Sequence, residues 1–299
     1  MKRIYGALLC LAFAITVSKC QSACEREGVV CGSVDHAAVD TATLAPSQSK
    51  RRWSAPDKCL SDTNFAHLED LWPKMHFRGP ISGPKSYFHR VPPHYLGRHA
   101  NFTRCRRRVY IDVGAGQFNS QGSSEGFLSM MKLYPSLVEF DEFYVFEAVP
   151  GKYVLPPPRE RKRVLKNAGM RASRAATFNR RHFFMQAFVG ARSDTSTVPP
   201  TIGFSDFLLT MLQLQPADAV VVKMDVEGYE YEVVDTLLRD GTAELIDEIM
   251  LEVHYSHPDM LRAFRWCKTP QFWCKYSLDN ATSLYTSLRG SGVYAHTWP

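Results

Sequence analysis

Apolar residues in the C-terminal two-thirds of the chain gather in short runs, and longer stretches with helical spacing separate these runs. The runs predict five β-strands, at residues 109–113, 143–146, 183–189, 219–224 and 248–253. The stretches between them predict helices at residues 124–134, 204–214 and 233–239. Strands that alternate with helices indicate βαβ units and a parallel sheet. Strand 219–224 is apolar almost throughout, as expected for a strand that helices cover on both faces.

The ends of these elements carry their own signals. Helix 124–134 ends before Pro135, and helix 233–239 stops at Asp240 and Gly241. The tail, residues 284–298, predicts one more helix and a last strand at 292–296. We therefore expect an α/β domain over residues 105–299, with a mostly parallel central sheet and helices on both faces.

The first residues of the chain follow a different pattern. Lys2 and Arg3 precede an apolar run at residues 4–17, and Ser18 and Cys20 are small enough for cleavage nearby. This layout is typical of a secretory signal peptide. The run is shorter than the roughly 20 residues of a membrane-spanning helix. We expect residues 1–20 to be a cleaved signal peptide, with a short anchor as the alternative, and in both cases the rest of the chain faces a lumen.

Two segments separate the signal peptide from the main domain. Residues 21–57 are rich in Ser, Ala, Thr and Asp and show little periodicity, which indicates a linker or stalk. Residues 58–104 predict a helix at 65–72 and then a stretch rich in Pro, Gly and His, which we interpret as a cap or lid. A chain of 299 residues has room for one sizeable domain with such an N-terminal extension.

The net charge of +6 is concentrated in short basic clusters. These clusters lie at residues 50–52, 104–108, 159–163 and 180–181. No nucleic-acid recognition motif accompanies them, and a lumen offers no obvious nucleic-acid partner. We interpret the clusters as solvated faces, with affinity for an acidic glycan or a lipid headgroup as a further possibility.

Cysteine usage agrees with a lumenal location. Outside the signal peptide the chain has six cysteines, at positions 24, 31, 59, 105, 267 and 274. An even number in an oxidising compartment allows three disulfides. Cys267 and Cys274, each next to a tryptophan, are the pair that we expect first. Buried free thiols are one alternative, and a zinc site with His254 and His257 is another, although its spacing matches no familiar finger.

Two sequons are potential N-glycosylation acceptors in such a compartment, Asn101-Phe102-Thr103 and Asn280-Ala281-Thr282. Sequons also occur by chance in chains that are not glycosylated. Asn280 is alternatively a helix-capping residue.

Acids and glycines follow the predicted strands at the points where each strand ends. They are Asp112, Gly114, Gly116, Glu147, Asp225, Glu227 and His254, the last being the one imidazole of the set. In an open α/β sheet, ligands bind outside the carboxyl ends of the strands. The glycine turn after the first strand lets a ligand approach the backbone closely at a helix N-terminus. Glu147 is placed to accept hydrogen bonds from both ribose hydroxyls of an adenosine cofactor.

A longer segment after strand 219–224 is more specific. Residues 223–230, Lys-Met-Asp-Val-Glu-Gly-Tyr-Glu, resemble the Lys-x-Asp-x-Glu-Gly-x-Glu signature of FkbM-type methyltransferases. Asp112-Val113-Gly114-Ala115 is similar to the cofactor loop of that family, Phe146-Glu147 to its second strand end, and residues 251–254 to its fifth strand. The resemblance covers residues 108–256 with the order preserved. The chain departs from the family at residues 116–118, Gly-Gln-Phe, where Asn-x-Gly is usual.

The resemblance implies a Rossmann-like, class I methyltransferase fold and transfer of a methyl group from S-adenosylmethionine to a hydroxyl oxygen. In such a reaction the protein mainly aligns donor and acceptor and excludes water. The acceptor must also lose its proton, and His254 and Asp225 are the catalytic candidates for this step. The cofactor-binding candidates are Asp112, Gly114, Ala115, Gly116, Glu147 and Glu227.

Several of these residues also have a purely structural interpretation. Glu227 can complement a helix dipole, and Glu230 can be a solvated helix acid. His254 can be a core histidine beside Tyr255. Paired acids could hold a divalent ion, but the sequence defines no ligand set, so we predict no metal.

The sequence thus predicts an S-adenosylmethionine-dependent O-methyltransferase of the secretory pathway, with a hydroxyl of a glycan or glycolipid as acceptor. The main alternative is a lumenal binding or scaffold protein that keeps the fold without turnover. A dinucleotide-dependent oxidoreductase would need a third glycine where Asn119 stands. A glycosyltransferase is also compatible with the compartment, but no Asp-x-Asp motif supports it.

Overall fold

The computed structural model describes residues 58–60, 95–98, 100–119, 126–258, 261 and 265–297. All of them belong to one compact unit, Ser49–Pro299. The predicted signal peptide, the linker and the helix at 65–72 lie outside the described residues. Within the described part of the chain, none of the helices has the length and apolar character needed to cross a membrane.

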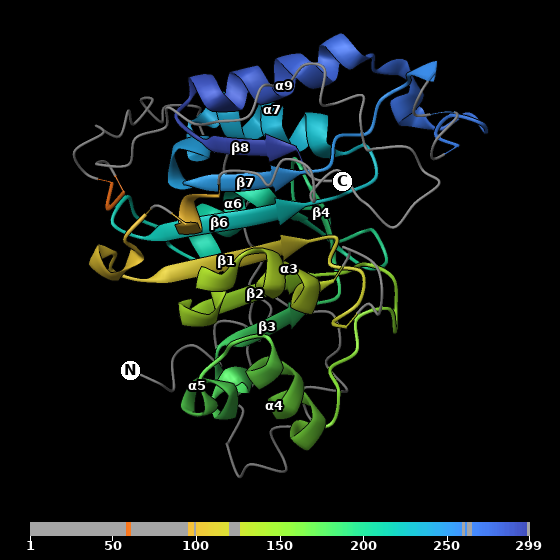
Figure 1. Ribbon diagram of the computed structural model, residues 1–299. Helices are drawn as coiled ribbons and strands as arrows, with labels where there is room; N and C mark the ends of the chain where they lie inside the picture. Colours follow the sequence, from red (N-terminus) through yellow and green to blue (C-terminus); the bar gives the residue numbers. More distant parts are fainter. Residues whose placement is uncertain are drawn as a thin grey trace, which may run out of the picture. The chain divides into compact units, whose positions relative to one another are not determined.

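Six parallel strands form the central sheet, and their arrowheads all point the same way in Figure 1. Each neighbouring pair is parallel, with Val109 opposite Val220 and Met224 opposite Leu251, for example. In spatial order the strands are β3 (His182–Met185), β2 (Glu142–Phe146), β1 (Arg108–Val113), β6 (Ala219–Met224), β7 (Glu248–Leu251) and β8 (Tyr294–Thr297). The predicted α/β class with a parallel, Rossmann-like sheet is confirmed.

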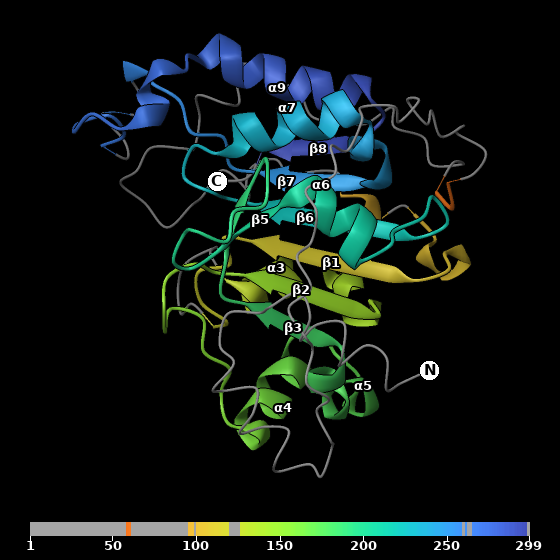
Figure 2. The same cartoon turned by 180° about the vertical axis from the view of Figure 1, so that it is seen from behind.

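Helices flank the sheet on both faces, as predicted. Figures 1 and 2 show α3 over one face and α6 over the other, α7 and α9 beside β8, and α4 and α5 beyond the β3 edge. The α-helices are α3 (Phe127–Leu133), α4 (Pro158–Asn167), α5 (Ala172–Ala176), α6 (Phe204–Asp206), α7 (Glu230–Asp240) and α9 (Leu278–Gly290). Short 3-10 helices are η4 (Leu96–Arg98), η5 (Phe102–Arg104), η6 (Pro135–Glu139), η7 (Phe178–Arg180), η9 (Thr242–Leu245) and η10 (Phe272–Lys275).

The core lies on both sides of the two central strands. β6 is buried along its whole length, and β1 is buried from its second residue onward. On one side Phe127 of α3 is the centre of an aromatic cluster, with ring centroids 5.5 Å from Phe118, 5.4 Å from Phe143 and 5.7 Å from Phe178. Because Phe118 belongs to the loop that follows β1, this packing anchors that loop against the sheet.

The prediction of one strand at residues 183–189 is wrong. The chain pairs with β2 as far as Met185 and then leaves the central sheet. Residues Phe188–Gly190 form β4, which pairs in parallel with β5 (Thr201–Gly203) in a separate two-stranded sheet. The apolar run continues through the break because Ala187 and Val189 are buried as well, so hydrophobicity does not reveal it.

Other elements differ from the prediction mainly in their limits. The helix predicted at 204–214 begins as α6 and continues as a π-helical turn, η8 (Phe207–Met211). Gly241 has a φ of 80° as the left-handed cap of α7, in agreement with the predicted stop. Helices α4 and α5 were not predicted.

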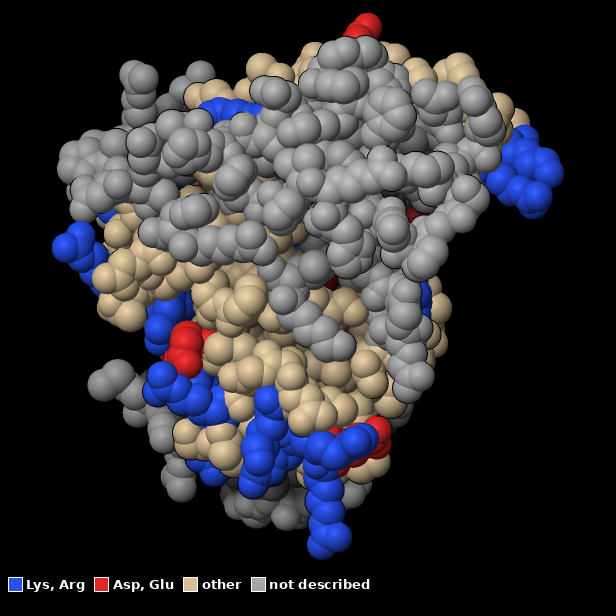
Figure 3. Space-filling model, viewed as in Figure 1, with Lys and Arg blue, Asp and Glu red and all other residues tan. Residues whose placement is uncertain are grey.

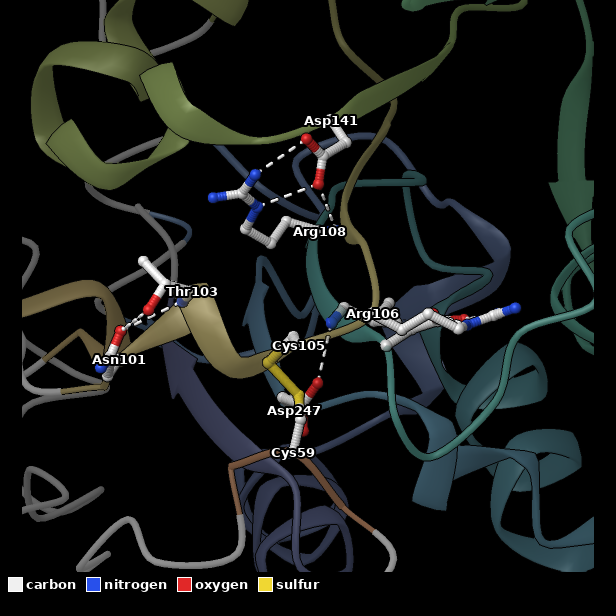
Figure 4. Close-up of a disulfide and its surroundings, with 10 residues drawn as sticks. Cys59, Asn101, Thr103, Cys105, Arg106, Arg108, Asp141 and Asp247 are labelled. Atoms are coloured by element: carbon white, nitrogen blue, oxygen red, sulfur yellow. Dashed lines mark hydrogen bonds and ion pairs between the residues drawn. A yellow bond between two sulfur atoms is a disulfide. The ribbon is translucent and has the colours of Figure 1, made fainter.

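The interpretation of the basic clusters as solvated faces is wrong for Arg107 and Arg108, which are half-buried in ion pairs, whereas Arg106 is exposed although it is paired as well. Arg106 and Arg107 bind Asp218 at 2.7 and 3.1 Å, and Arg108 binds Asp141 through two bonds of 2.9 Å (Figure 4). The arginines precede or begin β1, while Asp141 and Asp218 directly precede β2 and β6. These ion pairs therefore connect the amino ends of three neighbouring strands.

The clusters on α4 and η7 do form a solvated face. Blue Lys and Arg side chains gather on the lower part of the surface in Figure 3, where α4 and α5 lie. The exposed basic residues of this region are Arg159, Lys162, Arg163, Lys166, Arg171 and Arg180. Arg161 and Arg181 are exceptions. Arg161 is buried and donates a hydrogen bond to the Pro156 carbonyl at 3.1 Å, and the half-buried Arg181 donates to the Phe140 carbonyl at 2.6 Å.

The described residues of the segment 58–104 pack near the amino ends of β1, β6 and β7. A disulfide joins Cys59 to Cys105 (Figure 4), and the Cys59 N–H donates to the Pro216 carbonyl at 3.2 Å. Leu96 N–H donates to the buried carboxylate of Glu248 at 2.9 Å. The predicted lid concerns mostly residues outside the described part of the chain and stays a prediction.

Candidate functional site

The order of the strands reverses between β1 and β6, and a cavity opens at this point. From β1 the chain builds β2 and β3 on one side, and it later builds β6, β7 and β8 on the other. Ligands in open α/β sheets bind at such a switch point, outside the carboxyl ends of the strands. The cavity has a volume of about 770 Å³, which lies within the roughly 300–1,000 Å³ of small-molecule sites.

Strand ends form one wall of this cavity and the β4–β5 unit forms another. Residues 187–192, together with Asp194, Thr197 and Thr201, come from that second wall. Of the predicted site residues, four line the cavity: Gly114, Glu147, Asp225 and Glu227. The other four are also described but do not contribute to the lining: Asp112, Ala115, Gly116 and His254.

The turn after β1 depends on its two glycines. Gly114 has a φ of +73°, and a Cβ atom there would lie 1.8 Å from the carbonyl oxygen of Asp225. Gly116 has a φ of +63°. The N–H groups of Gly114 and Ala115 both donate to the Phe146 carbonyl, at 3.1 and 3.0 Å, so the turn is fixed to the end of β2.

Glu147, directly after β2, is held by this turn. Its carboxylate accepts hydrogen bonds from the N–H groups of Gly116 at 2.9 Å and Val149 at 2.8 Å. Lys152 Nζ lies 3.6 Å from the same carboxylate. Each carboxylate oxygen has about two acceptor positions, so both oxygens can still accept a hydrogen from a ligand.

Asp112 is buried beneath the turn beside Lys223 of β6. Lys223 Nζ lies 3.8 Å from Asp112 Oδ1, 3.8 Å from Asp225 Oδ2 and donates to the Gly114 carbonyl at 2.6 Å. Burial raises the pKa of Asp112 from 3.8 to about 6, although the charge of Lys223 opposes the rise. Lys223 therefore links the ends of β1 and β6 under the cavity.

Asp225 and Glu227 stand in the turn between β6 and α7. Glu227 has a φ of +54° and a largely exposed side chain, whereas Asp225 is mostly buried. Gly228 follows with a φ of +99°, and a Cβ atom there would lie 2.5 Å from Trp273. The close approach of Trp273 explains why a glycine stands here.

His254 lies beyond the end of β7 and is almost fully buried. Its Nδ1 is 3.0 Å from Glu230 Oε1, and its Nε2 is 3.4 Å from Glu227 Oε2 and 4.0 Å from Asp225 Oδ1. Burial opposes protonation of the ring, but the hydrogen bond and charge of Glu230, with the charges of neighbouring acids, raise the pKa of His254 from 6.5 to about 9. The ring thus faces three carboxylates in this structure.

A disulfide and two tryptophans hold the other side of the His254 ring. Trp266 and Trp273 lie with ring centroids 4.7 and 5.3 Å from it. Cys267 and Cys274 form a disulfide, as predicted, and so connect the two tryptophans. The alternative zinc site with these cysteines is wrong. Cys24 and Cys31 lie outside the described residues, so a third bridge stays a prediction.

Sequence reasoning missed three residues of this site. Glu230 is fully buried and bonds both His254 and the Val226 N–H, so its interpretation as a solvated helix acid is wrong. Lys223 belongs to the signature, but the signature alone indicates no role for its side chain, and no sequence pattern marks Lys152. The Lys-x-Asp-x-Glu-Gly-x-Glu spacing was the available signal for Lys223 and Glu230.

A parallel α/β sheet, a cavity at its switch point, a glycine turn after the first strand and an acid after the second strand are together typical of a Rossmann-like methyltransferase domain. A family model described as methyltransferase FkbM domain matches residues 112–276, more than half of the chain. The chain belongs to this family, as the resemblance implied. Searches of curated proteins and of solved structures return no match.

Proposed function

We propose that the chain is an S-adenosylmethionine-dependent O-methyltransferase of the secretory pathway, with a hydroxyl of a glycan or glycolipid as acceptor. The observation that carries the proposal is the cavity at the switch point, with the glycine turn and Glu147 on its wall. Family membership supports methyl transfer as the reaction. The sulfonium of the cofactor supplies the methyl group, so the task of the protein is alignment and exclusion of water.

The cofactor-binding residues that we propose are arranged around the end of β1. Glu147 accepts hydrogen bonds from the ribose hydroxyls while Gly116 and Val149 keep its carboxylate in place. Gly114 allows the cofactor to approach the backbone. Asp112 and Ala115 are buried and support the turn, and Glu227 lines the cavity.

For the catalytic step we propose Asp225 together with His254. Asp225 lines the cavity and is therefore the group that can contact an acceptor hydroxyl. His254 does not line the cavity, but its Nε2 lies 4.0 Å from Asp225 Oδ1. We infer that Asp225 contacts the acceptor hydroxyl and that His254 assists Asp225 in removing the proton of this hydroxyl.

The cavity wall formed by the β4–β5 unit supports the proposal of a sugar acceptor. Phe188 of β4 is exposed toward solvent and lines the cavity, while Arg192, Asp194 and Thr197 supply charged and polar groups near it. An apolar surface with a few oriented polar groups is typical of ligand sites, and it matches the mixed faces of a sugar ring. The two disulfides are compatible with an oxidising compartment.

Calorimetric titration of the full chain, purified with its disulfides intact, tests the cofactor site. We expect S-adenosylmethionine and its demethylated product to bind with micromolar affinity. Glu147→Ala should lose this binding, because the cofactor then has no carboxylate for its ribose. Glu160→Ala, which removes an exposed acid of α4, is the matched control and should bind as the unaltered chain does.

Absence of binding in folded, oxidised protein would overturn the enzyme proposal and favour the scaffold alternative. Equal binding by the Glu147→Ala variant would overturn the assignment of the ribose site. If binding is established, a screen of glycan and glycolipid acceptors by methyl-group mass shift tests the acceptor class.

A further inference from the structure

Three side chains at the carboxyl edge of β6 and β7 each offer one metal-ligand atom to a common point. They are Asp225, Glu227 and His254, and their ligand atoms lie within 4.8 Å of one another. We propose that these residues bind a single divalent cation at the edge of the cavity. This inference deepens the proposed function, on which its catalytic role rests, but the binding itself can be measured without it.

The orientation of His254 is the first argument for a cation. The buried carboxylate of Glu230 is hydrogen-bonded to His254 Nδ1 at 3.0 Å. The other ring nitrogen, Nε2, is therefore directed toward Glu227 and Asp225. Histidines that ligate metals usually donate their other ring N–H to a carboxylate, which fixes the tautomer and the ring plane. Glu230 therefore occupies the place of the supporting carboxylate, outside the three ligands.

The state of Asp225 is the second argument. Its Oδ1 atom is buried and, among the described residues, has no hydrogen-bond partner. Buried polar atoms are rarely left without a partner, because the loss of hydration is costly. A cation between Asp225 and His254 would coordinate this oxygen. Lys223 Nζ lies 3.8 Å from the other oxygen, Oδ2.

The third ligand is placed to close the site from the solvent side. The Glu227 side chain is 79% exposed and its Oε2 lies 3.4 Å from His254 Nε2. Because the side chain is largely free, it can adjust to the distance of about 2.0–2.2 Å that carboxylates adopt around small divalent ions. Asp225 and Glu227 both line the cavity, so a cation here borders the space for the ligands.

One imidazole and two carboxylates leave coordination positions open. With the cation bound, Asp225 and His254 act on the acceptor through the cation. A hydroxyl bound at an open position loses its proton to water more readily, because the cation stabilises the alkoxide. The alkoxide oxygen then forms a bond to the methyl carbon. The carbon–sulfur bond breaks with its electron pair on sulfur, so the sulfonium becomes a thioether and one proton is released to solvent.

Metal titration of the full chain tests this site without any methyl acceptor. Binding of Mn²⁺ is followed by its electron paramagnetic resonance signal, and binding of Zn²⁺ by calorimetry. We expect one ion per chain, with affinity at least tenfold lower in Glu227→Gln and in Asp225→Asn. Asp235→Asn removes an exposed acid of α7 outside the cluster and should leave binding unchanged.

The exposed position of Glu227 means that Glu227→Gln should fold normally, and circular dichroism checks this. Failure of both ions to bind, or equal affinity in all variants, would overturn the metal site. S-adenosylmethionine titrated in metal-free buffer separates the two proposals. Cofactor binding without metal binding would defeat the metal site alone, whereas metal binding without cofactor binding would support the metal site and overturn the proposed function.

Discussion

Gly114 and Gly116 share a left-handed backbone conformation in the turn after β1, but their surroundings differ. A Cβ atom at Gly114 would meet the backbone oxygen of Asp225, whereas the nearest atom at Gly116 is the flexible Lys152 Cε at 3.9 Å. Alanine at either position costs roughly 1–2 kcal/mol because of the backbone conformation. Gly114→Ala must also displace a neighbouring strand end, which adds roughly 1–3 kcal/mol.

Urea denaturation of the two variants measures this difference in the free energy of unfolding. We expect Gly114→Ala to be clearly less stable than Gly116→Ala. Equal losses would mean that the Asp225 backbone moves aside easily, and the turn would then be less constrained than the structure indicates.

Asp247 precedes β7 and is drawn near the Cys59–Cys105 disulfide in Figure 4. It is buried and accepts a hydrogen bond from the Val220 N–H at 2.8 Å. Burial raises its pKa from 3.8 to about 6, against the opposing charge of Lys58. A group whose folded pKa is raised contributes stability below its unfolded pKa, and this contribution is lost as the pH rises through the folded pKa.

Asp247→Asn removes this titration while keeping an oxygen that can accept from Val220. Between pH 4 and pH 7 the unaltered chain should therefore lose roughly 2 kcal/mol of stability relative to the variant. Denaturation curves at several pH values check the difference, and other titrating groups cancel because both proteins contain them. A difference that does not vary with pH would contradict the raised pKa.

For single residues, the position relative to the predicted strands is sufficient to identify some site residues but not others. Glu147 and Asp225 were found because acids directly after parallel strands must lie at the ligand edge of the sheet. Glu230 was not, because its inward direction depends on the turn with positive φ at Glu227 and Gly228. Lys152 is brought to Glu147 by a loop that has no periodic pattern.

Among the elements, α9 shows how a short local motif fixes a helix end. Ser277 Oγ accepts from the Asn280 N–H at 3.3 Å, and Asn280 Oδ1 accepts from the Ser277 N–H at 2.8 Å. This reciprocal capping box agrees with the alternative in which Asn280 caps a helix. The helix then begins at Leu278, before the predicted 284.

Ser277→Ala should destabilise the chain by about 1 kcal/mol, because the N-terminal turn of α9 loses a cap. Ser283→Ala is a suitable control, since Ser283 is exposed within the same helix and alanine is favourable there. Thermal unfolding compares the two variants. A loss in Ser283→Ala as large as that in Ser277→Ala would contradict a specific capping role.

Elements with strong apolar patterns were predicted, and those without were not. β1 and β6 are apolar because helices cover both of their faces, so their sequences indicate strands directly. Helix α4 is highly charged, and its buried residues are Arg161 and Leu165, so the stretch resembles a solvated basic run. The sequence does not reveal the β3–β4 break, because β4 pairs with β5 and periodicity along the chain cannot show this pairing.

At the scale of the whole molecule, the alternation of strands and helices predicted a parallel sheet, but the path of the N-terminal segment depends on long-range contacts. Leu60, Tyr95, Leu96 and Phe102 are buried in the core cluster that contains α3. The Cys59–Cys105 disulfide and the hydrogen bond from Leu96 to the Glu248 carboxylate hold these residues in the core. Both contacts join positions that are far apart in the sequence.

The two disulfides should therefore differ in their effect on stability. Cys59–Cys105 spans 46 residues and Cys267–Cys274 spans 7. A crosslink stabilises mainly by restricting the unfolded chain, so their contributions are roughly 4 and 2 kcal/mol respectively. Replacing both cysteines of each pair by serine and measuring guanidinium denaturation tests the order.

We expect the Cys59→Ser, Cys105→Ser chain to lose more stability, since it also frees the buried residues of the N-terminal segment. The Cys267→Ser, Cys274→Ser chain should instead change the site, because Trp266 and Trp273 would no longer be tied beside His254. Its metal affinity should fall while its unfolding midpoint changes less. The opposite order of stabilities would indicate that the short disulfide, and not the long one, holds the domain together.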